Sequence, residues 1–153
     1  MQTGTMRLRE LTVRYAVRKD REGEPIVVGR VLARPSDAAS ALMTLLQDEP
    51  AEVFAIVCLT TKHRVIAYHE VSRGTLDSTL AHPREVFKAA LLANAAAIVA
   101  AHNHPSGDPT PSPDDLDLTR RLAAAGDVLG VPMLDHIVIG DGCYYSFKEA
   151  GRV

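Results

Sequence analysis

The stretch AIVAAHNHPSGDPTPSPDDLDLTRRLAAAGDVLGVPMLDHIVIG, residues 97–140, decides the fold. It begins with a short apolar run over 97–101, which predicts a buried strand. A loop rich in proline follows over 102–111, and apolar residues then recur at helical spacing over 113–129. A second apolar run over 134–139 predicts another strand. The order strand, helix, strand indicates helices packed on a sheet.

Local signals mark both ends of the predicted helix over 113–129. Ser112 is the expected N-cap, a proline follows it at the first helical position, and Asp115 stands where a capping box places its acidic member. After the helix, Gly130 suits the C-terminal cap and Pro132 prevents continuation. These signals predict a helix that begins directly after the proline-rich loop.

Apolar runs on both sides of this unit predict the remaining elements. Residues 52–59 form a continuous apolar run typical of a buried strand, and residues 64–71 form the next strand of a hairpin. The other predicted elements are a helix over 83–93 and a last strand over 143–147, after a turn at 141–142. Together they predict the α/β (α+β) class, with one central mixed β-sheet flanked by helices.

The N-terminal region predicts additional structure. Apolar and polar residues alternate over 11–17, which indicates a strand with a basic outer face, and a second short strand is expected over 26–32. A helix with Ser36 as its N-cap should follow and end near residue 47. We therefore expect residues 1–50 to form a basic strand/helix extension packed on the main domain, which spans residues 51–153.

Composition narrows the class of protein. The chain has 153 residues, 17 Lys+Arg, 19 Asp+Glu and 46% apolar residues. That length suits one domain of ordinary size, and the composition excludes disordered, collagen-like and disulfide-scaffold chains. The longest apolar run falls far short of the ~20 residues that a membrane span needs. We expect a cytoplasmic protein without membrane contact, whose first 35 residues hold 8 basic and 4 acidic residues.

A candidate metal site lies at the start of the proline-rich loop. If the extended strand continues, His102 and His104 point to the same side, so that two imidazoles can bind one ion. Asp115, in the first turn of the next helix, could complete the site. Two histidines and one carboxylate, with a position left for water, match the ligand set of a catalytic zinc site. Neither Cys58 nor Cys143 is near in sequence.

Two further residues are candidates for chemistry. Glu52, at the start of an apolar strand, could accept a proton from a metal-bound water, although it could also be a surface charge. Ser112 could donate a hydrogen bond to an oxyanion, and it is also the predicted helix cap. His136 lies within an apolar strand, where it is either a core histidine or a partner that orients a metal ligand.

The motif formed by these residues resembles a known family. The pattern His102-x-His104-x(7)-Ser112-x-x-Asp115, with Glu52 upstream, is similar to the JAMM motif of JAB/MPN-domain metalloproteins. The longer stretches resemble the RadC branch of that superfamily. They are GTLDSTL at 74–80, PRE at 83–85, HNHPSGDPTPS at 102–112 and LDHIVIG at 134–140, within a resemblance that covers residues 50–150.

The resemblance implies a fold and a set of roles. The fold is a single JAB/MPN domain, similar to cytidine deaminases. One zinc ion per chain is held by His102, His104 and Asp115, Glu52 is the acid/base, and Ser112 is the oxyanion partner.

Three functions follow as hypotheses. The first is a zinc-dependent hydrolase that cleaves a peptide or isopeptide amide with a metal-activated water, so that a peptide or protein is its substrate. The alternative is a non-catalytic zinc module associated with DNA repair, which binds nucleic acid through the basic arm. A zinc deaminase is disfavoured because the P-C-x-x-C ligand pair is missing. A homodimer could form through the exposed strand predicted over 11–17.

Overall fold

The computed structural model describes residues 4–74 and 81–153. Within them, three helices and five strands follow one another in the order α1-β1-β2-α2-β3-α3-β4-β5. The helices are α1 (Pro35–Leu46), α2 (Pro83–Leu92) and α3 (Pro113–Leu129). The strands are β1 (Val53–Leu59), β2 (Val65–Arg73), β3 (Ala97–Asn103), β4 (Met133–Ile139) and β5 (Tyr144–Ser146).

The five strands form one mixed sheet in the order β2-β1-β3-β4-β5. Strands β3 and β4 are parallel and are joined by α3, whereas β1 pairs antiparallel with both β2 and β3. Strand β5 returns antiparallel beside β4. This confirms the predicted mixed sheet, the β1–β2 hairpin and the strand–helix–strand unit.

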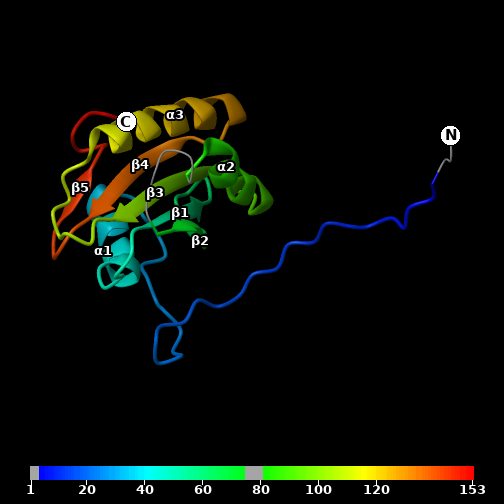
Figure 1. Ribbon diagram of the computed structural model, residues 1–153, viewed down its shortest axis with the longest axis horizontal. Helices are drawn as coiled ribbons and strands as arrows, with labels where there is room; N and C mark the ends of the chain where they lie inside the picture. The colour runs from blue at the N-terminus through cyan, green and yellow to red at the C-terminus, as the bar shows by residue number, and fades with distance from the viewer. Residues whose placement is uncertain (1–3, 75–80) are drawn as a thin grey trace.

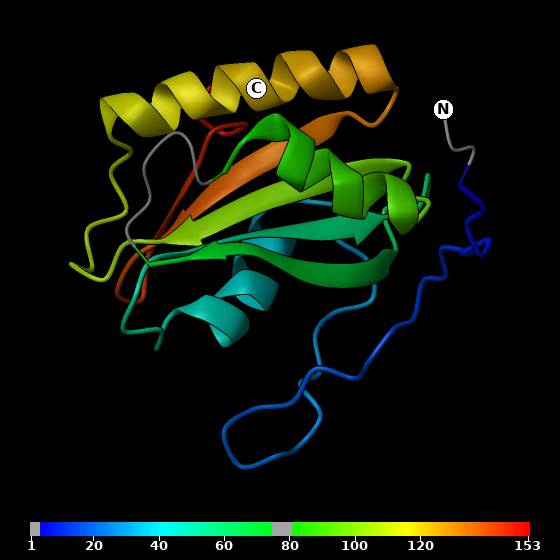
Figure 2. The same ribbon diagram turned by 45° about the vertical axis from the view of Figure 1, so that its right-hand side comes forward.

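Helices cover both faces of the sheet. Figure 2 shows α1 on one face and α2 with α3 on the other. Two separate apolar clusters fill the spaces between the layers. Because both faces are covered, every residue of β1 and β3 is buried, which explains their continuous apolar sequences. The predicted flanking of the sheet by helices is confirmed.

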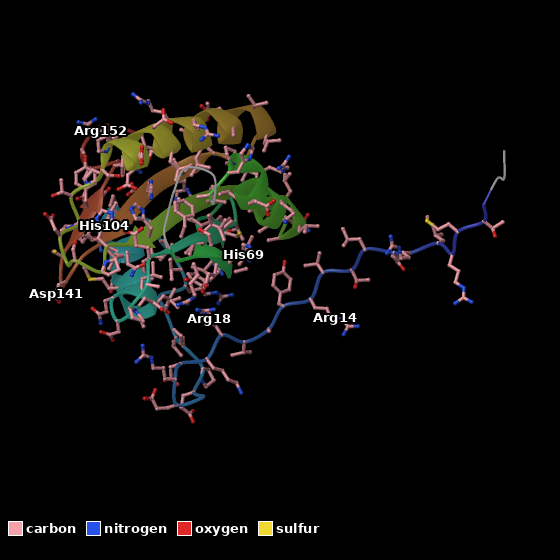
Figure 3. All side chains as sticks on the ribbon, in the orientation of Figure 1. Arg14, Arg18, His69, His104, Asp141 and Arg152 are labelled. Atoms are coloured by element: carbon pink, nitrogen blue, oxygen red, sulfur yellow. The ribbon has the colours of Figure 1, made fainter. Side chains whose placement is uncertain are left out.

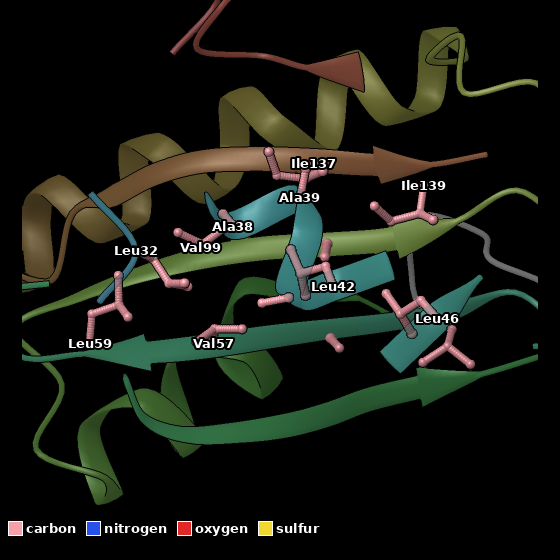
Figure 4. Packing of buried hydrophobic residues seen from close by; sticks show 14 residues of the cluster. Leu32, Ala38, Ala39, Leu42, Leu46, Val57, Leu59, Val99, Ile137 and Ile139 are labelled. Carbon is pink, nitrogen blue, oxygen red and sulfur yellow. The ribbon is translucent and has the colours of Figure 1, made fainter. Parts of the chain in front are cut away.

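Helix α1 belongs to the same packed unit as the sheet. Its apolar face places Leu42 and Leu46 in a cluster with Val57, Val99 and Ile137 of the central strands (Figure 4). Leu42 and Leu46 are almost fully buried. The helix therefore closes one side of the core.

The structure contradicts the strand predicted over 11–17. Residues 4–18 are exposed and extended, and they lie outside every strand (Figure 1). Between residues 19 and 31 only two isolated bridges occur, Lys19 with Pro25 and Val31 with Arg64, so the strand predicted over 26–32 is also wrong. An alternating pattern does not make a strand unless a neighbour pairs with its backbone. The division of the chain at residue 50 and the nucleic-acid role of the arm stay predictions.

Arg18 is a contact point between the sheet and the N-terminal arm, which is residues 4–34 in the described part of the chain. The Arg18 guanidinium lies 4.9 Å from the centre of the Tyr68 ring and 3.5 Å from the Glu70 carboxylate, both on β2. Figure 3 shows Arg18 close to the sheet and Arg14 farther out along the extended arm.

Several element boundaries also differ from the prediction by one or two residues; β2, for example, is Val65–Arg73 and not 64–71. The N-cap of α1 is Arg34, whose backbone N–H donates to the Asp37 carboxylate at 2.9 Å, so Ser36 is not the cap. Strand β3 continues two residues farther than expected, through His102 and Asn103.

The 74–80 segment of the family resemblance lies, from residue 75 on, outside the described residues. In the described part of the chain, none of the helices is long and apolar enough to cross a bilayer.

Candidate metal centre

Two histidines stand side by side where β3 ends. His102 is the penultimate residue of the strand and His104 follows it by two positions, so both side chains leave the same face of the sheet. Their Nε2 atoms are 3.0 Å apart. His102 is almost fully buried, whereas His104 is partly exposed. The expected pairing of the two imidazoles is present.

Asp115 comes to the same point from the first turn of α3. Its Oδ1 lies 3.3 Å from His102 Nε2, and its Oδ2 lies 3.2 Å from His104 Nε2. The predicted capping box holds the carboxylate in place: Ser112 N–H donates to Asp115 Oδ2 at 2.8 Å, and Asp115 N–H donates to Ser112 Oγ at 3.1 Å. The Asp115 carboxylate is thus both a member of the capping box of α3 and a candidate metal ligand.

The proton on His104 can be placed from its neighbour. Its Nδ1 lies 2.8 Å from the backbone carbonyl of Asp108. A carbonyl only accepts, so Nδ1 carries the hydrogen, and in neutral His104 the lone pair is on Nε2, toward His102 and Asp115. Ligand atoms of the three residues lie within 4.8 Å of one another. Acceptor atoms that converge in this way fit a cation, and two imidazoles with a carboxylate suit a divalent transition metal.

The electrostatics of the three residues also favour the binding of a cation. Burial raises the pKa of Asp115. In the metal-free site this effect is outweighed by the Ser112 N–H, by the charge of His102, and by hydrogen bonds that His102 and His104 donate from Nε2 when their rings are protonated, so the pKa of Asp115 is far below the usual value. The hydrogen bond to Asp115 raises the pKa of His104 against the opposing effect of burial. The site therefore strongly favours an anionic carboxylate beside positive charge.

The loop that carries His104 is fixed by close backbone contact with β4. His104 N–H donates to the Ile139 carbonyl, and Asp141 N–H donates to the Gly107 carbonyl, both at 2.9 Å. Between them stands Gly140, where any side chain would collide with the Gly107 carbonyl. Glycine at this position lets the loop lie against the strand and hold His104 in place.

Glu52 lies beside this group. It directly precedes β1, whose second residue, Phe54, pairs with His102 across the sheet. The side chain is half-buried, and its negative charge contributes to the raised pKa of His104. Glu52 is therefore within electrostatic reach of His104, although the two residues are far apart in the sequence.

Asn103, between the two histidines, was not identified from the sequence. Its side chain points to the opposite side of β3 and binds the backbone on both sides of Glu52. Oδ1 accepts from Val53 N–H at 2.7 Å, and Nδ2 donates to the carbonyls of Ala51 at 3.0 Å and Glu49 at 3.3 Å. Asn103 thus links the chain that carries Glu52 to the strand that carries the histidines. A buried polar residue inside an apolar strand was the available signal.

We expect Asn103→Ala to destabilise the protein by about 2–4 kcal/mol, because it leaves the buried Val53 N–H and two carbonyls without their partner. Asn103→Asp keeps the acceptor for Val53 but loses the amide donor, and it should also destabilise. Denaturant unfolding measures both, with the exposed Gln47→Ala as a control that should stay within about 0.5 kcal/mol. An Asn103→Ala variant as stable as the wild type would contradict this role.

Ser112 and the two cysteines, which were also considered from the sequence, have structural surroundings of their own. Ser112 caps α3 as predicted, and because its oxygen accepts from Asp115 N–H, its own hydrogen is left to donate outward. Cys58 is buried in β1, and Cys143 contacts the Gly107 carbonyl at 3.6 Å. Neither thiol belongs to the cluster of His102, His104 and Asp115, which is the one group found in residues 4–74 and 81–153 that could hold a metal ion.

His136 is both a core residue and a neighbour of the site. It is fully buried in β4, with its Nε2 2.8 Å from His102 Nδ1 and its Nδ1 2.7 Å from the Thr119 hydroxyl. Burial, together with the charge of His102, holds its pKa well below the usual value. Thr119 was not identified from the sequence, because it lies at an ordinary position of α3.

Comparisons with known proteins identify the family of the chain. The family described as RadC-like JAB domain matches residues 32–152. The chain is 49% identical to a UPF0758 protein of Alkaliphilus oremlandii over 115 residues, which are 75% of this chain and 50% of the relative. It is 43% identical to a UPF0758 protein of Desulfitobacterium hafniense over 148 residues, which are 97% and 65%. A UPF0758 protein of Moorella thermoacetica is 51% identical over 119 residues, which are 78% and 52%.

The chain thus spans between one half and two thirds of the length of these relatives. The matched family segment contains Glu52, the histidine pair, Asp115 and the whole sheet. The chain belongs to the RadC-like JAB domain family.

Proposed function

We propose that the protein is a zinc-dependent hydrolase that cleaves an amide bond in a peptide or protein. The observation that carries this proposal is the convergence of His102 Nε2, His104 Nε2 and the Asp115 carboxylate at one point. Within the described residues this group has three protein ligands and no cysteine. Three protein ligands leave a coordination position for water, which is the pattern of catalytic rather than structural zinc.

A zinc ion held by His102, His104 and Asp115 would act as a Lewis acid and would lower the pKa of a water molecule toward neutral. In this proposal Glu52 accepts the proton of that water on its carboxylate and passes it to the departing amine nitrogen. An amide needs such a donor because an unprotonated amine is a poor leaving group. Its half-buried position beside the histidines supports this role for Glu52.

Ser112 supplies the third part of the proposed chemistry. Its oxygen is fixed by Asp115 N–H at 3.1 Å, at the exposed start of α3. The hydroxyl hydrogen can therefore donate to a substrate carbonyl oxygen as negative charge develops there. The helix N-terminus adds a favourable positive potential at the same place.

The proposal is tested by metal content and by hydrolysis measured together. Protein purified without added chelator should contain one zinc ion per chain by plasma mass spectrometry. The zinc-loaded protein should release new amino groups from a panel of peptide and isopeptide substrates, and chelation should stop this release. A protein that takes up no zinc from a zinc-containing buffer would refute the metal site. Zinc binding without hydrolysis of any amide in the panel would contradict the proposed reaction.

A further inference from the structure

A chain of hydrogen bonds runs through the core from α3 to the candidate metal site. The Thr119 hydroxyl lies 2.7 Å from the Asp115 backbone carbonyl and 2.7 Å from His136 Nδ1. His136 Nε2 then lies 2.8 Å from His102 Nδ1. Thr119, His136 and His102 are each at most 1% exposed. Water therefore does not compete for these bonds, and the direction of each one can be worked out.

The donor in each hydrogen bond can be assigned starting from the backbone carbonyl of Asp115. A carbonyl oxygen has no hydrogen, so an O···O distance of 2.7 Å requires the Thr119 hydroxyl to donate to it. The hydroxyl has one hydrogen, which is then used. At its contact with His136 it can only accept, and the hydrogen of that bond must be on His136 Nδ1.

The position of the hydrogen on His136 determines which atom donates in the contact between His136 and His102. Its ring is enclosed between aromatic side chains, stacked on Phe147 with ring centres 4.9 Å apart and edge-on to Phe54 at 5.5 Å. A second proton would place a charged ring in this apolar space, so the neutral form is favoured. With its one hydrogen on Nδ1, His136 has a bare Nε2. The 2.8 Å contact is then a bond donated by His102 Nδ1.

We propose that Thr119 and His136 are positioning residues that fix the hydrogen of His102 on Nδ1 and so hold its Nε2 lone pair toward the metal. This inference rests on the proposed metal site. The chain begins and ends on Asp115, whose carbonyl accepts from Thr119 and whose Oδ1 faces His102 Nε2 at 3.3 Å. One residue of α3 therefore supplies a ligand and also sets the tautomer of another ligand.

The two histidine ligands are oriented by different means. His104 donates from Nδ1 to the Asp108 carbonyl in the loop, which is a direct and partly exposed bond. His102 donates from Nδ1 to a second, uncharged imidazole inside the core. A partner on the far nitrogen of a metal-bound histidine typically changes metal affinity by about 10–100-fold. We expect the buried arrangement to fall within this range.

The test is a matched pair of substitutions at Thr119. Thr119→Ser keeps the hydroxyl, whereas Thr119→Val has nearly the same shape and removes it. Nitrogen-15 NMR of histidine-labelled protein reports which ring nitrogen carries hydrogen. In the wild type and in Thr119→Ser we expect the hydrogen of His136 on Nδ1, without zinc and with zinc, and that of His102 on Nδ1 in the zinc-loaded protein.

In Thr119→Val, His136 Nδ1 has no acceptor, so its hydrogen should move at least in part to Nε2. That form opposes the tautomer of His102 that binds metal, and the zinc affinity should fall by about 10–100-fold. Zinc affinity is measured by competition with a chromophoric chelator, and thermal unfolding of the zinc-free variants shows whether they fold. A purely structural role would lower the unfolding temperature and leave the tautomer and the zinc affinity unchanged.

Wild-type His136 with its hydrogen on Nε2 would overturn the proposal, as would a Thr119→Val variant with unchanged tautomer and zinc affinity. Failure of the proposed function has a different result. If the wild type binds no zinc, the metal site is refuted, and the tautomer of His136 in the zinc-free protein still shows whether the hydrogen-bond chain runs in the inferred direction.

Discussion

A Glu52→Gln variant is expected to bind one zinc ion per chain and to hydrolyse its amide substrate about 10²–10⁴ times more slowly than the wild type. Glutamine keeps the size and shape of the side chain, but it cannot accept a proton from water or return one to the amine. None of the three ligand atoms is altered, so the metal should remain. The measurement is kcat under saturating zinc, with metal content determined on the same samples.

The control for this variant is Asp48→Asn, which removes a carboxylate charge four positions away on an exposed loop residue. Its activity should equal that of the wild type, because the site is not touched. If Glu52→Gln also retained full activity, Glu52 would be removed from the mechanism and another base would be required. If Glu52→Gln lost its zinc, the residue would instead act by holding the metal.

Features set by neighbours in the sequence were predictable. The limits of α3 follow from Ser112, the proline after it and Gly130, and the structure has the helix within those limits. The pairing of His102 with His104 follows from a two-residue alternation, and the capping box at Asp115 is also a local pattern. That Asp115 joins the two histidines was implied by the resemblance to the JAMM motif, and in the structure the three side chains lie together. The structure therefore brings together the residues that the sequence indicated as ligands.

Features that depend on distant neighbours were not predictable in the same way. Residues 11–17 have the alternation of a strand, but they are exposed because none of the described strands pairs with them. Asn103 and Thr119 are ordinary polar residues until the fold brings Val53 to one and His136 to the other. Hydrogen-bond partners 17 to 50 positions apart leave no periodic signal in the sequence.

The second large effect is expected when a ligand is removed. Asp115→Asn should lower the zinc affinity by more than the about 10–100-fold that the loss of a supporting partner costs, and hydrolysis should be lost with the metal. An amide oxygen has no net charge to balance the ion, although it can still accept from Ser112 N–H and so keep α3 capped. Titration against a chromophoric chelator and plasma mass spectrometry measure this loss.

The neighbouring Asp114 provides a matched control, because it lies in the same first turn of α3, is exposed and is not in the ligand group. Asp114→Asn removes the same charge from the same helix terminus, so any general effect on α3 is shared by both variants. We expect Asp114→Asn to keep one zinc ion and full activity. The zinc-free forms of the two variants should unfold at similar temperatures, because the core on both faces of the sheet is unchanged. Equal zinc content in both variants would show that Asp115 is not a ligand and would leave His102 and His104 as an incomplete site.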